Sequence, residues 1–275
     1  MRIQVKRLFG GRGQGPAMVS PDPISFLGGV APTTGDIIDT HSPLCGRNVS
    51  GRILAFPCGK GSTVGSYILY GLARRGRAPA AIIVERPDTI VTVGAVIGKI
   101  PAVYGMPPDV LRDGEWVEVD ADKATVRVRD VTSYEVVTCF LRNRGRILLL
   151  RRSAKVGTFQ GTWAGVSGYI EGDEVFLERA LKEISEETGM ADPELVSTGE
   201  PIYARNGNRL FIVHPYIFEV TTRDVHLDWE HAEYRWVKPA EVSTFKGVPK
   251  LVEAYQSAAN GTVARMLKRI RGPSP

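Results

Sequence analysis

The chain has 275 residues, of which 43% are apolar and 24% are charged, and its formal net charge is +5. This composition predicts a soluble globular protein, and the length is enough for two domains of ordinary size. The longest apolar runs are far too short to cross a bilayer and no signal-peptide pattern opens the chain, so we expect a cytoplasmic protein without a membrane partner. Cys45, Cys58 and Cys139 lie far apart with no histidine at ligand spacing. They fit a reducing cytoplasm and exclude a cysteine-ligated cluster built by this chain alone.

Basic residues gather at the two ends of the chain. Residues 1–19 combine a glycine-rich run with several cations ahead of the first acid, which predicts a flexible basic extension. Residues 261–275 predict a basic tail. A basic tail can contact nucleic acid, but no recognition motif accompanies either end. We therefore expect solvated tails or contact with an acidic partner, and no nucleic-acid binding.

Two α/β domains are expected, over residues 20–132 and 133–260. In chain order, the first should contain a strand over 52–56, a glycine-rich loop over 57–62, an amphipathic helix ending near Arg75, a buried strand over 80–84, a short apolar segment over 90–97 and antiparallel strands within 115–128. The second should contain strands over 135–141 and 146–150, a charged helix ending near residue 188 and a last helix over 249–259.

The glycine-rich loop of the first domain is of a kind that binds anions. The N–H groups at a helix N-terminus and the nearby Lys60 favour phosphate or carboxylate. The spacing is not that of a Walker loop. In the alternative interpretation, Gly61 only makes a turn and Ser62 caps the helix.

The charged helix of the second domain carries Glu183, Glu186 and Glu187 at the spacing i, i+3, i+4, which places all three on one face. Like charges so close repel one another, and a divalent cation such as Mg²⁺ is the usual partner of such carboxylates. The alternative is a solvated face with i, i+4 ion pairs, such as Arg179 with Glu183. The apolar residues on roughly the opposite face are expected to pack against the core: Leu177, Leu181, Ile184 and Thr188.

Residues 168–190 closely resemble the Nudix box, the signature of hydrolases that cleave nucleoside diphosphates linked to other moieties. The match runs from Gly168 through Glu174 to the glutamate cluster and Gly189, and its one departure is Lys182, where the family has arginine. Lysine keeps the charge but loses the planar fork that orients the glutamates in the family. The resemblance implies an α/β/α sandwich with a mixed sheet. It also implies Mg²⁺ or Mn²⁺ ions held by the following residues: Glu183, Glu186, Glu187 and the nearby carbonyl of Gly168.

Further roles follow from the same resemblance. Glu187 or Glu230 would be the general base, and Glu174 would support the helix by reaching Lys182. Arg151 and Arg152 could meet phosphate oxygens, or they could be two exposed arginines at a strand end.

Several motifs of the first domain resemble the aconitase X small-subunit, or swivel-domain, family. They lie within residues 24–130, at 26–39, 41–46, 51–54, 59–66 and 76–81. The resemblance implies a β/β/α swivel domain that in archaea is the small subunit of phosphomevalonate dehydratase. It would form a heterodimer with a separate large subunit that holds an iron–sulfur cluster.

The implied reaction is the dehydration of (R)-5-phosphomevalonate to trans-anhydromevalonate 5-phosphate. Ser62 matches the serine that removes the substrate proton as an alkoxide. Lys60, Gly61 and the more weakly supported Ser66 would hold the anionic substrate. Arg47 and His41 are weaker candidates.

Three interpretations remain open at this point. The first is a bifunctional chain, in which a dehydratase small subunit is fused to a working Nudix hydrolase. In the second, the Nudix half is a regulatory module without turnover, which the lysine at position 182 favours. In the third, the chain is a stand-alone Nudix hydrolase with a structural N-terminal domain, which the intact Gly-Lys-Gly-Ser loop argues against.

Overall fold

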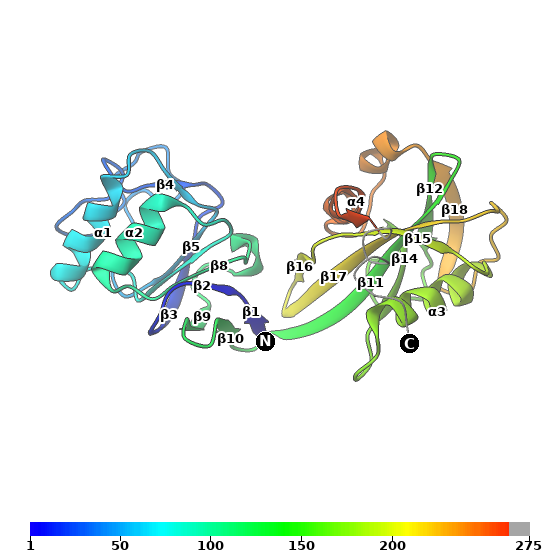
Figure 1. Cartoon of the computed structure of the whole chain (residues 1–275), viewed down its shortest axis with the longest axis horizontal. Coiled ribbons are helices and arrows are strands. Elements are labelled where there is room, and N and C mark those ends of the chain that lie inside the picture. The colour runs from blue at the N-terminus through cyan, green and yellow to red at the C-terminus, as the bar shows by residue number, and fades with distance from the viewer. Residues whose placement is uncertain (264–275) are drawn as a thin grey trace, which may run out of the picture. The chain divides into compact units, whose positions relative to one another are not determined.

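The computed structural model describes residues 1–263, and these divide into a first unit, Met1–Thr132, and a second unit that begins at Ser133 (Figure 1). Each unit combines a large sheet with two α-helices, so the expected class of two α/β units is confirmed. Within this described part, no helix is both long and apolar enough to cross a membrane.

The first unit is built on a mixed sheet whose described strands run in the order β1-β10-β9-β3-β5-β7-β8-β2. Strands β3, β5, β7 and β8 are parallel, and the remaining neighbours pair antiparallel. The bounds are β1 (Arg2–Gln4), β2 (Lys6–Phe9), β3 (Arg12–Val19), β5 (Ile53–Phe56), β7 (Ala81–Val84), β8 (Ala102–Tyr104), β9 (Trp116–Asp120) and β10 (Thr125–Val128). Every residue of β5 and β7 is buried, as expected for parallel strands at the centre of a covered sheet.

Two helices pack on one face of this sheet, α1 (Gly65–Arg74) and α2 (Thr89–Gly98) (Figure 1). A Cβ on Gly94 would fall 2.5 Å from Leu69 Cδ1, so the glycine permits the close approach of α2 to α1. The short apolar segment that the sequence indicated over 90–97 lies within α2. The smaller elements of the unit are β4 (Ile24–Ser25), β6 (Gly59–Lys60) and a 3-10 turn, η1 (Pro108–Val110).

The expectation of a flexible extension over residues 1–19 is wrong, because this segment supplies β1, β2 and β3. Strand β3 lies inside the sheet, between β5 and β9. Its glycines serve close packing: a Cβ on Gly13 would collide with the carbonyl of Ala80, and one on Gly15 with the carbonyl of Gly51. Of the expected basic tail, Thr262–Val263 form β19, and residues 264–275 lie outside the described residues.

The second unit contains a sheet whose described strands follow the order β13-β12-β11-β17-β15-β19, with β14, β16 and β18 paired to β11, β17 and β12. The bounds are β11 (Thr132–Asn143), β12 (Arg146–Arg152), β13 (Trp163–Ala164), β14 (Val166–Tyr169), β15 (Glu194–Thr198), β16 (Ile202–Asn206), β17 (Arg209–Glu219) and β18 (His231–Val237). The helical elements are α3 (Phe176–Thr188), α4 (Leu251–Ala259) and a 3-10 segment, η2 (Pro239–Thr244).

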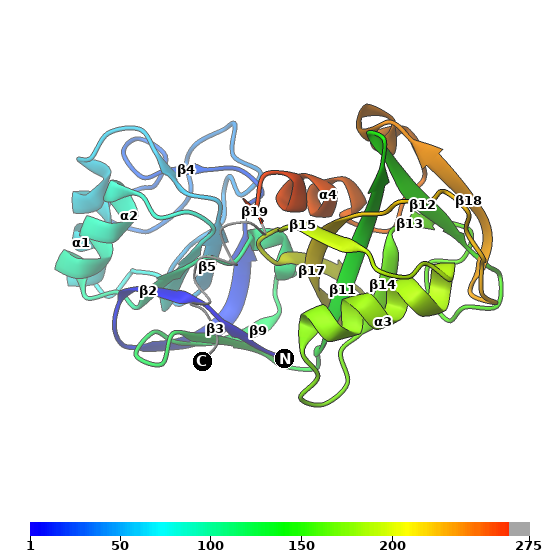
Figure 2. The same ribbon diagram turned by 45° about the vertical axis from the view of Figure 1, so that its right-hand side comes forward.

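Alternation along β12 shows how the sheet of the second unit is covered on both faces. Leu148 and Leu150 pack in one core with Ile184 of α3, whereas Ile147 and Leu149 pack in another with residues of α4. The unit is therefore a sandwich of helix, sheet and helix, as Figure 2 shows for α3 and α4.

Candidate active sites

The loop between β5 and α1 is held in place by Asp88, the N-cap residue that directly precedes α2. The N–H of Gly59 donates to Asp88 Oδ2 at 2.7 Å, while Asp88 Oδ1 accepts from the N–H of Val91 at 2.9 Å and so caps α2. A Cβ on Gly59 would fall 2.6 Å from Asp88 Oδ1, so the tether requires glycine. Gly61 has φ of +95°, a conformation that side chains rarely adopt.

Ser62 lies exposed on this loop, just before α1. Its Oγ accepts a hydrogen bond from the N–H of Val64 at 3.3 Å. Gly61 makes the turn that the alternative interpretation expects, but the N-cap of α1 is Val64, so Ser62 caps the turn that leads into the helix and not α1 itself. Ser66 is buried, and its hydroxyl donates to the carbonyl of Thr63 at 2.7 Å. The expectation that Ser66 contacts substrate therefore finds no support in this geometry, whereas the Ser62 hydroxyl faces solvent.

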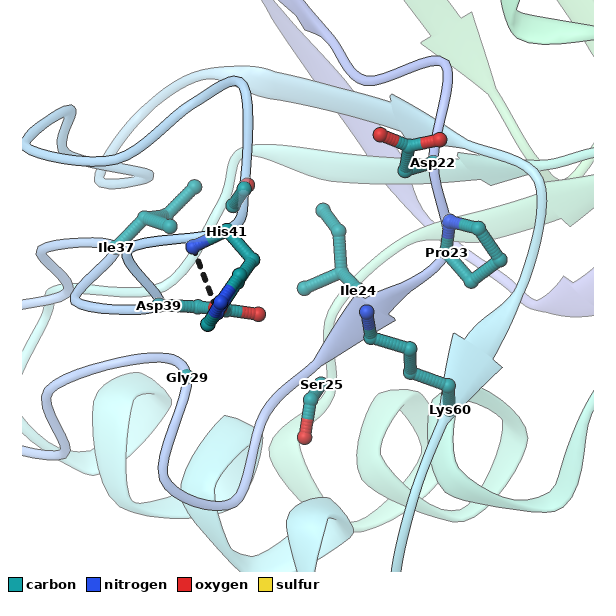
Figure 3. Close-up of a pocket in the computed structure, with 10 residues that line it drawn as sticks. Asp22, Pro23, Ile24, Ser25, Gly29, Ile37, Asp39, His41 and Lys60 are labelled. Carbon is teal, nitrogen blue, oxygen red and sulfur yellow. Dashed lines mark hydrogen bonds and ion pairs between the residues drawn. The ribbon is translucent and has the colours of Figure 1, made fainter.

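A pocket of about 160 Å³ opens beside the loop (Figure 3). Lys60 reaches over it from β6, and Ser25 lines it from β4. His41 stands at the rim with its side chain 95% exposed, 3.6 Å from Asp39. Arg47 lies elsewhere and forms a bidentate pair with Asp113, both distances being 2.9 Å. Of the weaker candidates, His41 is thus near Lys60, and Arg47 has a structural partner.

The three glutamates of α3 differ in burial. Glu183 and Glu187 are buried, 7% and 4% exposed, while Glu186 points outward with a 56% exposed side chain, 4.0 Å from Lys182. Residues 183 and 187 lie one helical turn apart, and residue 186 is rotated away from both. Of the expected apolar face, Ile184 and Thr188 are buried and Leu177 packs against the same core, whereas Leu181 is exposed.

Glu187 lies deepest of the three carboxylates. Its Oε1 accepts from the N–H of Ser167 at 3.4 Å, and its Oε2 is buried without a hydrogen-bond partner among the described residues. Burial, reinforced by the charge of Glu183, raises the pKa of Glu187 well above its ordinary value. Nε2 of His231 lies 3.6 Å from Glu187 Oε2.

His231 is held from its other side by Asp228, whose Oδ1 lies 2.8 Å from Nδ1. Burial lowers the pKa of His231, and the hydrogen bond to Asp228 opposes that shift. Glu230 is half-buried next to this pair, and its charge contributes to raising the pKa of both Glu183 and Glu187. The structure therefore brings Glu230 into the electrostatic range of the buried carboxylates.

Gly168 packs directly against Glu183. A Cβ at this position would overlap Oε1, Cδ and Cγ of the glutamate, so strand β14 and α3 can approach only because residue 168 is glycine. Across β14, Gly168 and Ser167 also line a pocket of about 90 Å³. Its remaining walls are mostly apolar or aromatic and include Phe159, Tyr169 and Phe211.

The two predicted phosphate-binding arginines have different surroundings. Arg152 lines the pocket beside Ser167 and Gly168, and its Nε donates to the carbonyl of Thr158 at 3.1 Å. Arg151 pairs on the surface with Glu233 of β18 at 3.4 Å and is absent from the pocket wall. Of the two arginines, only Arg152 lines the pocket beside Gly168.

Comparison with known proteins matches each unit separately. The family model for the aconitase X swivel domain matches residues 2–128, and the model for the NUDIX domain matches residues 133–257. A phosphomevalonate dehydratase small subunit of Thermococcus sibiricus is 52% identical over 130 residues, which are 47% of this chain and 100% of that protein.

The chain belongs to the aconitase X swivel-domain family. Its second unit is a Nudix domain.

Among solved structures, the holo-form of Thermococcus kodakaraensis aconitase X is 45% identical, covering 46% of this chain and 98% of that chain with a TM-score of 0.46. The MutT protein of Methanosarcina mazei Go1 is 25% identical, covering 52% of this chain and 98% of that chain with a TM-score of 0.39.

The Nudix domain offers a donor set that suits a divalent ion. Within residues 1–263, no three acidic, histidine or cysteine side chains converge as a preformed metal site, because Glu183 is turned to Arg179 and Glu186 to Lys182. Oε2 of Glu187 is nevertheless a buried acceptor without a hydrogen bond among the described residues, and oxygen is the ligand type that Mg²⁺ and Mn²⁺ prefer. The residues present therefore fit such an ion.

The sequence did not reveal the roles of four residues that contribute to the two sites. Asp88 and the pair of Asp228 with His231 come from segments remote from the loop and from α3, and no local spacing signals them. Arg179 was recognised only as one member of an ordinary i, i+4 ion pair. Its bond to Glu183 is buried, which the sequence did not reveal.

Replacing Asp88 by Ala should destabilise the swivel domain by about 1–2 kcal/mol, because α2 loses its cap as well as the tether to the loop. Asp88→Asn separates the two effects: its carbonyl oxygen still caps α2, but its amide nitrogen cannot accept from the N–H of Gly59. We expect Asn to retain most of the unfolding free energy while losing the hydrogen bond that protects the N–H of Gly59. Urea unfolding and amide hydrogen exchange would measure the two effects, and equal stability losses in both variants would contradict the separation.

Gly168→Ala should destabilise the Nudix domain by about 1–3 kcal/mol, since the new methyl group must displace Glu183. Gly157→Ala is the matched control, because a Cβ there meets nothing within 4 Å and the residue has an ordinary φ. Thermal unfolding of the two full-length variants would test the expectation. Similar melting temperatures would show that β14 and α3 can move apart freely.

Proposed function

We propose that this chain is the small subunit of a phosphomevalonate dehydratase fused to a metal-dependent Nudix diphosphate hydrolase. The observation that carries the first half is the exposed Ser62 hydroxyl, whose oxygen accepts a hydrogen bond from the N–H of Val64. This N–H group would stabilise negative charge on the serine oxygen, and Lys60, two residues earlier in the same loop, favours an anionic substrate in the neighbouring pocket. The names of the relatives of the swivel domain support the substrate, (R)-5-phosphomevalonate.

In this proposal Ser62, as an alkoxide, takes the proton from the substrate carbon next to the one that bears the hydroxyl group. The electrons of the broken C–H bond form the double bond, and the C–O bond breaks so that the hydroxyl group leaves as hydroxide. The proton taken up by Ser62 converts the hydroxide to water and restores the alkoxide, so no redox partner is needed. Lys60 and the loop N–H groups, including that of Gly61, would hold an anionic end of the substrate. The iron–sulfur cluster that assists departure of the hydroxyl group would belong to a separate large subunit, in a heterodimer of the archaeal mevalonate pathway.

In the Nudix half, the bound Mg²⁺ or Mn²⁺ would polarise the diphosphate and lower the pKa of the attacking water. Glu183, Glu186 and Glu187 would hold the ion near the carbonyl of Gly168, with Glu186 turning inward from Lys182. Glu187 or Glu230 would take the proton of the water, and Arg152 would hold phosphate oxygens. Water adds to one phosphorus atom and the bridging P–O bond breaks. The products are two monophosphates, one of which is inorganic phosphate when the terminal phosphate of the substrate carries no organic group.

The pocket beside Gly168 supports a substrate whose organic group is apolar. The wall includes one charged side chain, Arg152, and no Asn, Gln, Asp or Glu that would pair with the edge of a nucleobase. Two of its hydroxyls, those of Thr138 and Ser167, lie 3.0 Å apart and are within hydrogen-bond distance of each other. We therefore expect diphosphates with short branched hydrocarbon groups, such as isopentenyl diphosphate, to be hydrolysed in preference to nucleoside diphosphates. A screen in which nucleoside diphosphates are hydrolysed and isopentenyl and mevalonate diphosphates are not would refute this preference.

Anaerobic affinity purification of the chain from its native cells, followed by mass spectrometry and iron analysis, tests the dehydratase half. Recovery of a larger iron-containing partner, together with phosphomevalonate dehydration, is the expected result. If no such partner is recovered and diphosphates are hydrolysed, the chain is a stand-alone Nudix hydrolase with a structural first domain. If the complex dehydrates its substrate but no diphosphate is cleaved, the Nudix domain is a regulatory module.

A further inference from the structure

Two cations on α3, Arg179 and Lys182, are candidates to orient the carboxylates, and they differ sharply in burial. The Arg179 side chain is 14% exposed, and its Nη2 lies 2.5 Å from Oε1 of Glu183. Lys182 is 55% exposed and approaches only Glu186, at 4.0 Å. The exposed, 4.0 Å pair of Lys182 with Glu186 contributes little to holding either side chain in place. The short and buried pair of Arg179 with Glu183 fixes the geometry of both partners.

Arg179 also contacts the segment that leads into the helix. Its Nη1 lies 3.7 Å from Oε1 of Glu174, and Oε2 of the same Glu174 accepts from the N–H of Glu171 at 3.1 Å. Glu174 is the residue that the family pattern pairs with an arginine at position 182. In this structure the contact with Glu174 is made by Arg179, which lies three residues before Lys182 on the helix.

We propose that Arg179, rather than Lys182, is the positioning residue that orients Glu183 for metal binding in the Nudix domain. Glu183 is confined from two sides: Gly168 packs against its carboxylate and side-chain carbons, and the guanidinium holds Oε1. The rotamer of Glu183 is thereby fixed before any ion binds. A planar guanidinium can contact two carboxylates at once, which an ammonium group such as that of Lys182 does less well.

Arginine at position 179 thus compensates for lysine at position 182. The lysine at position 182 is then no reason to expect a Nudix domain without turnover. The inference rests on the proposed function, in that Glu183 is taken as a metal ligand.

The test compares Arg179→Ala, Arg179→Lys and Lys182→Ala in the full-length protein. Mn²⁺ affinity is measured by the EPR signal of free Mn²⁺, alongside kcat, KM and the melting temperature. Loss of a residue that orients a metal ligand typically costs about 10- to 100-fold in affinity, which we expect for Arg179→Ala. Arg179→Lys should fall between it and the wild type, and Lys182→Ala should stay within about twofold of the wild type because its ion pair is exposed.

A second comparison separates positioning from a merely structural role. In a Glu183→Gln background, Arg179→Ala should change Mn²⁺ affinity little further, because the residue through which Arg179 acts is already altered. Wild-type Mn²⁺ affinity in Arg179→Ala, or an equal loss in Lys182→Ala, would overturn the inference. If Arg179→Ala does not fold, unchanged affinity in Arg179→Lys overturns it instead. Absence of Mn²⁺ binding by the wild-type protein would refute the proposed function itself.

Discussion

Ser62→Ala is expected to abolish dehydration by the complex of this chain with its large subunit, while diphosphate hydrolysis by the same molecule continues at the wild-type rate. Removal of a general base typically costs about 100- to 10,000-fold in rate. The Ser62 side chain is exposed, and the hydrogen bond that its Oγ accepts from the N–H of Val64 is long, at 3.3 Å. The change should therefore alter the unfolding free energy by less than about 0.5 kcal/mol. Steady-state dehydration of phosphomevalonate by the reconstituted heterodimer is the measurement.

The two domains of the chain act as controls for each other in this experiment. A loss of both activities in Ser62→Ala would indicate misfolding or aggregation, not loss of a base. Retained dehydration with an intact complex would show that the proton is removed by another residue. Lys60→Ala helps to separate the roles, because it should raise KM for the phosphorylated substrate more than it lowers kcat.

Periodic patterns predicted most of the regular elements because their cause is local. The strand over 146–150, the helix after the glycine-rich loop and the last helix all follow from alternation or helical spacing, and each lies within a few residues of its expected position. The N-terminal strands were missed for a physical reason. The glycines of β3 resemble those of a flexible linker, and only the neighbouring backbones at Ala80 and Gly51 show that close packing requires them.

The candidate site of the Nudix domain was predicted in its residue types but not in its burial. Helical spacing places Glu183, Glu186 and Glu187 near one another, yet the sheet beneath α3 covers residues 183 and 187 and leaves 186 exposed. The partner of Glu187 on the far side, His231, begins β18 and is more than forty residues away along the chain. Such a contact depends on the pairing of β18 with β12, which no local pattern specifies.

Glu187→Gln should eliminate Mn²⁺-dependent hydrolysis and at the same time raise the melting temperature of the metal-free protein. Loss of a metal ligand or general base is expected to lower kcat by at least about 100-fold. The stability gain follows from burial: the charged form of Glu187 is disfavoured by burial and by the neighbouring Glu183, and its Oε2 has no hydrogen bond among the described residues. Glutamine cannot ionise and keeps an acceptor for the N–H of Ser167. A gain of about 1 kcal/mol corresponds to roughly 4 °C for a domain of this size.

The stability gain of Glu187→Gln should depend on pH in a defined direction. Because burial raises the pKa of Glu187 above its ordinary value of 4.5, the folded metal-free protein keeps a proton that the unfolded chain has already released. The contribution of this proton to the stability of the wild-type protein is therefore complete below pH 4.5 and is lost as pH rises through the raised pKa. The glutamine variant does not share this loss, so its stability gain over the wild type grows with pH. Melting temperatures in EDTA should diverge with increasing pH, and Glu178→Gln, on the exposed surface of α3, should follow the wild type. Added Mn²⁺ should reverse the order, since only the wild-type carboxylate gains a counter-ion, and a variant that binds Mn²⁺ as tightly as the wild type would exclude Glu187 as a ligand.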